Sequence, residues 1–144
     1  MLPKQTHVMT IAGWILSGLV ILFLLMDAGM KLAAMPIVLQ TTADLGWPGD
    51  AAMAQTLGTV LLAATLLYAY PNTKLLGAVL VTAYLGGAVA THVRIGSPLA
   101  SHILFGVYLD IMLWGGLWLR EPRLRALFPV TNPVANPVAK KAQD

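Results

Sequence analysis

Four long apolar stretches dominate the pattern of hydrophobic and polar positions along this chain. They cover residues 11–35, 51–70, 75–93 and 99–119, and short segments with polar residues and prolines separate them. A helix of roughly 20 residues spans a hydrocarbon core about 30 Å thick. Because no water reaches the backbone inside such a core, each stretch is predicted to form a transmembrane helix.

A proline marks each break between or after the predicted spans: Pro36, Pro71, Pro98 and Pro122. Proline disfavours continuation of a helix because it lacks the amide hydrogen and its ring crowds the preceding turn. The breaks are short, so successive spans should run in opposite directions. The predicted fold is an all-α membrane protein, an antiparallel bundle of four transmembrane helices formed by residues 1–129.

Positive side chains gather on one side of this predicted bundle. An even number of spans places both termini and the turn at residues 71–74 on the same side. That side holds Lys4, Lys74, Arg120, Arg123, Arg125, Lys140 and Lys141, whereas the opposite loops hold Arg94 with Asp44 and Asp50. The positive-inside rule therefore predicts that both termini are cytoplasmic. An aromatic belt is expected at the same interface, formed by Trp14, Tyr68, Tyr70, Trp114 and Trp118.

The C-terminal segment, residues 130–144, differs in kind from the rest. Asn-Pro-Val-Ala occurs at 132–135 and again at 136–139, before Lys140 and Lys141. Closely spaced prolines prevent a helix and cannot bury a core, so this segment is predicted to be a disordered cytoplasmic tail.

Composition supports a membrane protein and removes several classes of chemistry. Apolar residues make up 58% of the chain and charged residues 10%, whereas soluble domains are about a quarter charged. The absence of cysteine excludes thiolate nucleophiles, disulfides and iron–sulfur ligation. No basic patch with interleaved aromatic residues is present, which excludes nucleic acid as a partner.

Ionisable side chains interrupt three of the four apolar stretches. Asp27 and Lys31 lie in the first, His92 ends the third, and His102 and Asp110 lie in the fourth. Charge at the centre of a bilayer costs roughly 2.5–3.5 kcal/mol or more, so such groups usually line a protein interior or a cavity. These five residues are therefore the strongest candidates for function.

Asp27 and Lys31 are four residues apart and thus share one face of a helix, in the order that favours an ion pair. Two interpretations stay open. The pair neutralises itself and tolerates burial while Lys31 extends toward the interface, or it lines a pocket and binds or protonates a polar group.

His92 and His102 flank the short turn around Gly96 and should lie at similar depth near the outer surface. Four interpretations stay open: interfacial anchors, a base or donor in a pocket, a metal site, or haem ligation. Zinc requires a third ligand such as Asp27, and haem requires the rings to face each other across a flat cavity. We therefore expect no metal and no haem.

Asp110 should lie beyond the midplane of the fourth span, at the level of Thr82, with Tyr84 and Tyr108 facing each other further out. Either its carboxyl group holds two helices together through hydrogen bonds, or it carries a proton.

We predict one polar pocket in the outer half of the bundle that narrows through the two tyrosines toward Asp110. Its candidate ligand-binding residues are Asp27, Lys31, Gln55, Tyr84, Thr91, His92, Arg94, His102, Tyr108 and Asp110.

Small residues predict where helices touch closely in lipid. Ala83, Gly87 and Thr91 form one ladder on the third span, and Gly13 with Ser17 begins another on the first.

Several motifs together carry a resemblance to a known family. They are Asp27-x-x-x-Lys31, the sequence LGGAVATHVR at residues 85–94, Ser101-His102, the sequence WGGLWLR at 114–120 and PRLR at 122–125. Over roughly residues 11–129 the chain resembles the DoxX-like family of small four-helix bacterial membrane proteins. The resemblance implies a multi-pass protein of the bacterial inner membrane.

The wider superfamily includes a subunit associated with thiosulfate:quinone oxidoreduction, a component of a membrane redox complex, and eukaryotic cargo receptors and receptor-assembly chaperones. Related four-helix sterol isomerases hold lipophilic substrates. We expect the pocket to bind quinone or another small lipophile, without a covalently bound cofactor, in a membrane subunit or accessory of an oxidoreductase. The alternatives are an acid/base enzyme acting on a lipophilic substrate and a helper of another membrane protein. A redox or other membrane protein partner and a homo-oligomer are both compatible with the sequence.

Overall fold

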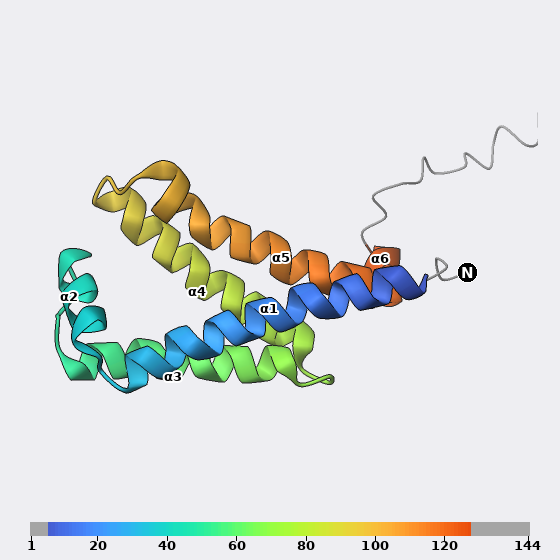
Figure 1. Cartoon of the computed structure of the whole chain (residues 1–144), viewed down its shortest axis with the longest axis horizontal. Helices are drawn as coiled ribbons and strands as arrows, with labels where there is room; N and C mark the ends of the chain where they lie inside the picture. Colours follow the sequence, from blue (N-terminus) through green and yellow to red (C-terminus); the bar gives the residue numbers. More distant parts are fainter. Residues whose placement is uncertain (1–5, 128–144) are drawn as a thin grey trace, which may run out of the picture.

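The computed structural model describes residues 6–127, and within that range the regular structure is entirely helical. Its elements are α1 (His7–Leu32), α2 (Pro36–Asp44), α3 (Ala51–Ala69), α4 (Lys74–Arg94), the π-helical turn η1 (Leu99–Ile103), α5 (Leu104–Arg120) and α6 (Pro122–Leu127). Figure 1 shows four long helices with α2 at one end of the bundle and α6, together with the start of α1, at the other. We call these the α2 end and the α6 end.

Four helices are long and apolar enough to cross a membrane: His7–Leu32, Ala51–Ala69, Lys74–Arg94 and Leu99–Arg120. This confirms the predicted class, an all-α protein with four transmembrane helices. Both ends of the described chain lie at the α6 end (Figure 1), as an even number of spans requires. The assignment of that end to the cytoplasm stays a prediction, and the predicted tail at 130–144 lies outside the described residues.

The boundaries of the first span differ from the prediction of 11–35. α1 begins at His7, where the hydroxyl oxygen of Thr6 accepts a hydrogen bond from the Met9 amide at 3.3 Å, and it ends at Leu32. A polar cap thus extends the helix beyond the apolar stretch, because the cap bonds an amide that has no partner within the helix.

Two prolines that were expected only to stop a helix instead begin the next one. Pro36 is the first residue of α2, and Pro122 is the first residue of α6. Proline suits this position because the first amides of a helix have no partner within the helix. Neither short helix was predicted from the sequence, because each proline by itself indicates only the end of the preceding helix.

α1 and α5 approach each other through small residues. A methyl group added at Gly116 would lie 2.6 Å from the Ser17 hydroxyl oxygen, and one added at Gly13 would lie 2.8 Å from the Gly116 carbonyl oxygen. The predicted contact ladder that begins at Gly13 and Ser17 is therefore confirmed.

α3 and α4 are in closer contact still, at Gly77. A methyl group added there would overlap the backbone of Tyr68. The Tyr68 side chain is fully buried, and its hydroxyl lies 2.9 Å from Ser17 Oγ and 3.2 Å from the Leu113 carbonyl oxygen. The prediction that Tyr68 belongs to an aromatic belt at the interface is therefore wrong. Instead, Tyr68 joins α3 to both α1 and α5 in the centre of the bundle.

An ion pair joins the start of α4 to the end of α5. Lys74 Nζ donates a hydrogen bond to Glu121 Oε2. This bond holds the pKa of the Glu121 carboxyl below its usual range, against the opposing effect of partial burial. The stabilising contribution of the pair is complete above the ordinary carboxyl pKa and is lost as the pH falls through the lowered value.

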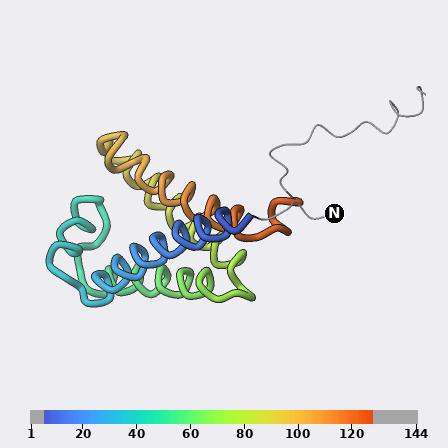
Figure 2. The backbone as a smooth tube through the Cα atoms, turned by 45° about the vertical axis from the view of Figure 1, so that its right-hand side comes forward, coloured from blue at the N-terminus to red at the C-terminus, as the bar shows by residue number. Residues whose placement is uncertain are grey.

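Toward the α2 end the bundle opens. Figures 1 and 2 show α4 and α5 diverging from α1 and α3 with distance from the α6 end, and α2 lying across the α1–α3 side of the opening. The close contacts at Gly13, Gly77 and Gly116 all belong to the closed half.

We predict that Gly77→Ala destabilises the protein strongly, by about 3 kcal/mol or more, because a backbone rather than a flexible side chain fills the space. The matched control is Gly86→Ala on the same helix, where no atom lies within 4 Å of the added methyl group. Alanine favours a helix by up to about 1 kcal/mol over glycine, so this control should unfold at or above the wild-type temperature. Thermal unfolding of the detergent-purified variants measures both, and equal melting temperatures would contradict the assignment of the contact.

Candidate functional site

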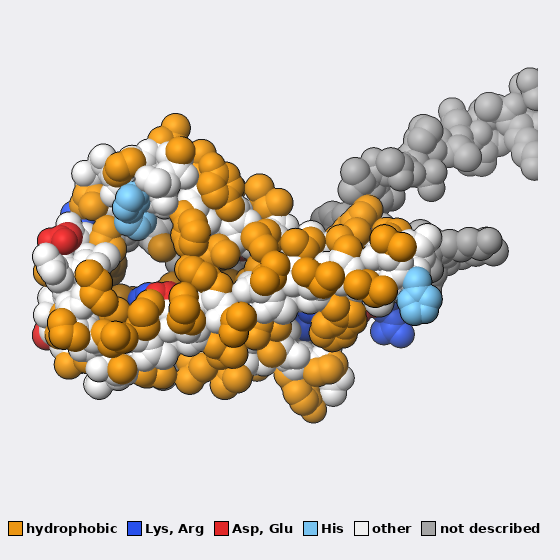
Figure 3. Space-filling model, viewed as in Figure 1, with side chains coloured by type: hydrophobic (Ala, Val, Ile, Leu, Met, Phe, Trp, Pro, Cys, Tyr) orange, Lys and Arg blue, Asp and Glu red, His pale blue; other side chains and the backbone are white. Residues whose placement is uncertain are grey.

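A cavity of about 550 Å³ occupies the opening between the two diverging helix pairs. Its wall comes from α1, α2, α4, η1 and α5, with Leu57 contributed by α3 and with Leu45 and Trp47 from the segment between α2 and α3. Figure 3 shows the molecule hollowed at this end, with charged and histidine side chains at the edge of the hollow. The predicted pocket in this half of the bundle is therefore present.

Most of the cavity wall is apolar. Phe23 of α1 and Phe105 of α5 are in edge-to-face contact, with ring centroids 5.3 Å apart, where the two helices begin to separate. The remaining large apolar side chains of the wall are Leu24, Met30, Ile37, Val38, Leu45, Trp47, Leu57, Leu85, Val89 and Leu109.

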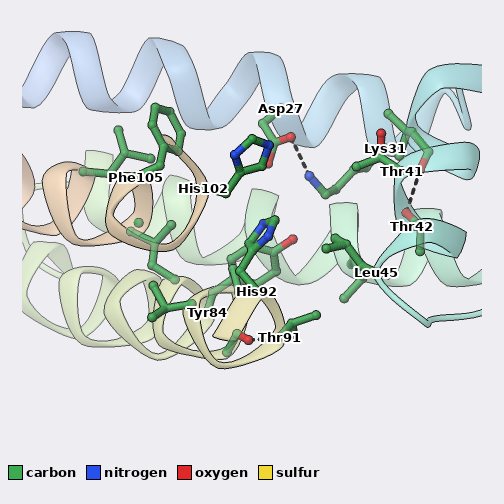
Figure 4. A pocket seen from close by; sticks show the side chains of 18 of the residues that line it. Asp27, Lys31, Thr41, Thr42, Leu45, Tyr84, Thr91, His92, His102 and Phe105 are labelled. Carbon is green, nitrogen blue, oxygen red and sulfur yellow. Dashed lines mark hydrogen bonds and ion pairs between the residues drawn. The ribbon is translucent and has the colours of Figure 1, made fainter. Parts of the chain in front are cut away.

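Asp27 and Lys31 form the predicted ion pair and also line the cavity. Lys31 Nζ lies 2.5 Å from Asp27 Oδ1, and the side chains are 17% and 25% exposed, respectively. Figure 4 shows the pair on α1, facing the cavity. The two interpretations from the sequence are thus compatible: the pair cancels its own charge and still presents polar atoms to a ligand.

His92 and His102 meet across the turn between α4 and η1, as predicted. Their ring centroids are 5.6 Å apart with the planes at 64°, and both line the cavity (Figure 4). His92 Nδ1 lies 2.9 Å from Ser97 Oγ, and His102 Nδ1 lies 2.8 Å from Ser101 Oγ. In either tautomer, this arrangement leaves Nε2 of each ring available to a ligand.

In residues 6–127 no three or more histidine, aspartate or glutamate side chains are grouped so as to hold a metal ion. The expectation that the protein binds neither metal nor haem stays a prediction.

The small residues of α4 have a different role from the predicted one. Ala83, Gly87 and Thr91 line the cavity, and no atom lies within 4 Å of a methyl group added at Gly87. The prediction of a helix contact here is wrong because α4 has diverged from the helices that it would have met. Small side chains leave room for the cavity instead, and Tyr84 on the same helix also lines it.

Two further candidates hold the edges of the site rather than line it. Gln55 Nε2 donates to the Leu32 carbonyl at 3.3 Å and so bonds a terminal carbonyl of α1. Arg94 Nη2 donates to the Leu45 carbonyl at 2.6 Å, next to Gly46, whose φ is +78°. Contrary to the prediction, neither is a lining residue; they fasten the ends of α1 and α2 to α3 and α4.

The cavity does not extend to Asp110, and this part of the prediction is also wrong. Asp110 Oδ1 accepts a hydrogen bond from Thr82 Oγ1 at 2.9 Å, which in turn accepts one from Trp114 Nε1 at 2.9 Å. Tyr108 is 45% exposed, and neither it nor Asp110 belongs to the wall. The expected level of Thr82 is confirmed, and Asp110 joins α4 to α5 outside the cavity.

The α2 side of the wall was not among the residues predicted from the sequence. Thr41 and Thr42 line the cavity beside Val38 and Leu45, and each hydroxyl donates to the backbone carbonyl four residues earlier at 2.7 Å. The available signal was the apolar residues Val38, in the helix that starts at Pro36, and Leu45, directly after its last residue. They are seven residues apart, the spacing of one helical face.

We predict that Asp27 and Lys31 are coupled in stability by about 1–3 kcal/mol. Lys31→Met or Asp27→Asn alone leaves one charge without a partner in an apolar wall, whereas the double variant removes both charges. The double variant should therefore be more stable than the sum of the two single effects indicates. Denaturation of all four proteins in one detergent measures the coupling. Lys31→Met combined with Asp110→Asn is the control and should be additive, because Thr82 bonds that carboxylate. Additivity in both cycles would contradict the pairing.

Comparisons with known proteins bear on the family alone. The model of the DoxX-like family matches residues 15–116, well over half of the chain. This range runs from α1 to α5 and includes every element of the cavity wall, although it is narrower than the expected 11–129. Searches among curated proteins and among solved structures found no match. The chain is a multi-pass membrane protein that belongs to the DoxX-like family.

Proposed function

We propose that the cavity binds a small lipophilic molecule with a neutral head group that accepts hydrogen bonds, of the quinone class. The protein would serve as a membrane subunit or accessory of an oxidoreductase in the bacterial inner membrane. One observation carries the proposal: a largely apolar cavity into which an ion pair and two histidines converge.

The size and composition of the cavity match those of small-molecule sites. Ligand pockets usually measure about 300–1,000 Å³ and are lined by hydrophobic side chains with a few placed polar groups. The volume here, about 550 Å³, lies within that range. Phe23 and Phe105 at the narrow end offer aromatic surface to the apolar body of a ligand.

The charge balance of the wall favours a neutral head group. Asp27 cancels the charge of Lys31, and among the described residues no other carboxylate, lysine or arginine lines the cavity. A carboxylate or phosphate head would add a charge that the site does not balance, which is costly in apolar surroundings. A carbonyl head adds none.

Hydrogen-bond donors are available for such a head. The Lys31 ammonium has three N–H groups, and one hydrogen bond, to Asp27, engages it. Nε2 of His92 and of His102 can each donate or accept, depending on the tautomer. A molecule with two carbonyl groups can therefore receive a hydrogen bond from α1 and another from the turn between α4 and η1.

The oxidoreductase role rests on the resemblance to a family whose wider superfamily includes subunits of membrane redox systems. With no cysteine, the chain cannot supply a disulfide or an iron–sulfur cluster of its own. A quinone held here would therefore exchange electrons with a partner protein.

We predict that a short-chain ubiquinone raises the melting temperature of the purified protein saturably. Lys31→Met and His92→Ala should each weaken binding roughly tenfold or more, the size of one hydrogen bond to a charged or buried group. Tyr108→Phe is the control because Tyr108 lies outside the cavity, and it should bind as wild type. A hydrocarbon of the same chain length but without the quinone ring tests whether the protein recognises the head group. Unchanged binding in both cavity variants would overturn the proposal.

A second candidate is acid/base catalysis on a lipophilic substrate, such as a double-bond isomerisation. The observation that favours it is the presence of a carboxylate and two imidazoles in one apolar cavity, since these groups move protons in many enzymes. Asp27, His92 and His102 would be the proton-transferring residues.

For this candidate we expect turnover by the purified protein without any partner. Incubation with an unsaturated sterol ketone in deuterated water should give an isomer that carries solvent deuterium. Loss of a general acid or base should slow turnover about 10²–10⁴-fold in His92→Ala or Asp27→Asn, with Tyr108→Phe unaffected. Binding of the ketone without isomer or deuterium exchange would argue against catalysis and leave the binding role.

A further inference from the structure

One arginine at the α6 end, Arg125, is buried without a carboxylate partner among residues 6–127. It is 5% exposed, and its Nε and Nη2 have no hydrogen-bond partner in that part of the chain. Its Nη1 contacts Met9 Sδ at 3.6 Å, and its guanidinium carbon lies 5.9 Å from the centre of the Trp118 ring. Thioether sulfur is a weak acceptor, so these contacts leave most of the donor capacity unused.

A buried guanidinium in this state requires a counterion. The group stays charged at any pH that a cell experiences, and an uncompensated ion costs several kcal/mol when it is withdrawn from water. Buried donors in native proteins nearly always have partners. The unused Nε–H and Nη2–H lie on one edge of the guanidinium plane, which is the geometry that grips two oxygens of one anion.

No carboxylate among residues 6–127 is committed to this role. Glu121 is paired with Lys74, Asp110 with Thr82 and Asp27 with Lys31. Asp50 caps the start of α3, and Asp44 ends α2 at the opposite end of the bundle. The counterion must therefore come from outside the described part of the chain.

The surroundings of Arg125 indicate what that counterion is. It lies just beyond Leu99–Arg120, the last helix that can span the membrane, and hence at the depth where lipid phosphates begin. The Arg120 guanidinium, on Trp14 at 4.4 Å and Tyr68 at 5.7 Å, adds positive charge to the same end. We propose that Arg125 binds the phosphate of an anionic phospholipid at the α6 end.

The site is reachable without opening the core of the bundle. The contacts of Arg125, Met9 near the start of α1 and Trp118 near the end of α5, lie at the rim of the bundle. Because Arg125 is buried in this arrangement, binding of a phosphate requires the six-residue helix α6 to shift. This lipid site is independent of the cavity near the α2 end and does not rest on the function proposed for it.

The test is titration of the detergent-purified full chain with dioleoylphosphatidylglycerol, dioleoylphosphatidylcholine or inorganic phosphate. Native mass spectrometry counts bound lipid, and the melting temperature reports stabilisation. We expect phosphatidylglycerol to bind most tightly, because choline neutralises its own phosphate. Arg125→Gln should weaken that binding at least about tenfold, the size of a charge-assisted hydrogen bond. The matched control is Arg123→Gln, an exposed arginine of the same helix with the same change in charge, which should change it less than about threefold, as expected for a surface charge.

Three results would overturn the proposal. Equal losses in the Arg125 and Arg123 variants would show diffuse attraction rather than a site. Equal affinity for phosphatidylglycerol and phosphatidylcholine would show that the site does not recognise the charge of the head group. Stabilisation by inorganic phosphate alone, lost in Arg125→Gln, would assign the site to free phosphate. If Arg125→Gln does not fold, Arg125→Lys keeps the charge without the planar fork; it should bind phosphatidylglycerol several-fold more weakly, and wild-type affinity would reject the site.

Discussion

The contact between Gly77 of α4 and the backbone of Tyr68 is the constraint on which the arrangement of the bundle depends. It brings two helices closer than any side chain permits, and it orients Tyr68 so that its hydroxyl reaches Ser17 and Leu113. All four spanning helices are thereby joined in one half of the molecule. In lipid, where helices gain little from the hydrophobic effect, such close packing and buried hydrogen bonds determine which helices associate.

The cavity exists because these close contacts join the four helices in only one half of the bundle. Helices held together near the α6 end diverge toward the α2 end, where α2 and the bonds of Gln55 and Arg94 fasten the separated elements. Polar groups in that space face an apolar wall, so their charges must balance internally. Asp27 and Lys31 meet this requirement within one helix turn, which is why a bilayer protein tolerates both. Arg125 at the opposite end has no such partner within the described chain, and an anionic lipid is the partner that we propose for it.

Predictions from the sequence succeeded where one helix, or two segments joined by a short turn, contained all the information. Spacing placed Asp27 beside Lys31, and a short turn placed His92 beside His102. The predictions failed where the same sequence pattern fits two different surroundings of a side chain. Gly87 and Thr91 carry the spacing of a helix contact but face the cavity, and Tyr68 carries the position of a belt residue but lies in the core. Pattern alone does not distinguish a small residue that admits a helix from one that leaves a space.

The sequence by itself determined the number of spans, their alternating direction and which ionisable groups lie within them, because apolar length and the positions of charged residues along a span are properties of the local chain. Only the tertiary structure decided that the bundle opens at one end, that α2 borders the opening, and that Gln55, Arg94, Tyr108 and Asp110 do not line the cavity. These features depend on the angles between helices, which follow from contacts such as Gly77 with Tyr68 between residues on different spans. The hydrophobic periodicity along one helix does not determine the angle at which it crosses another.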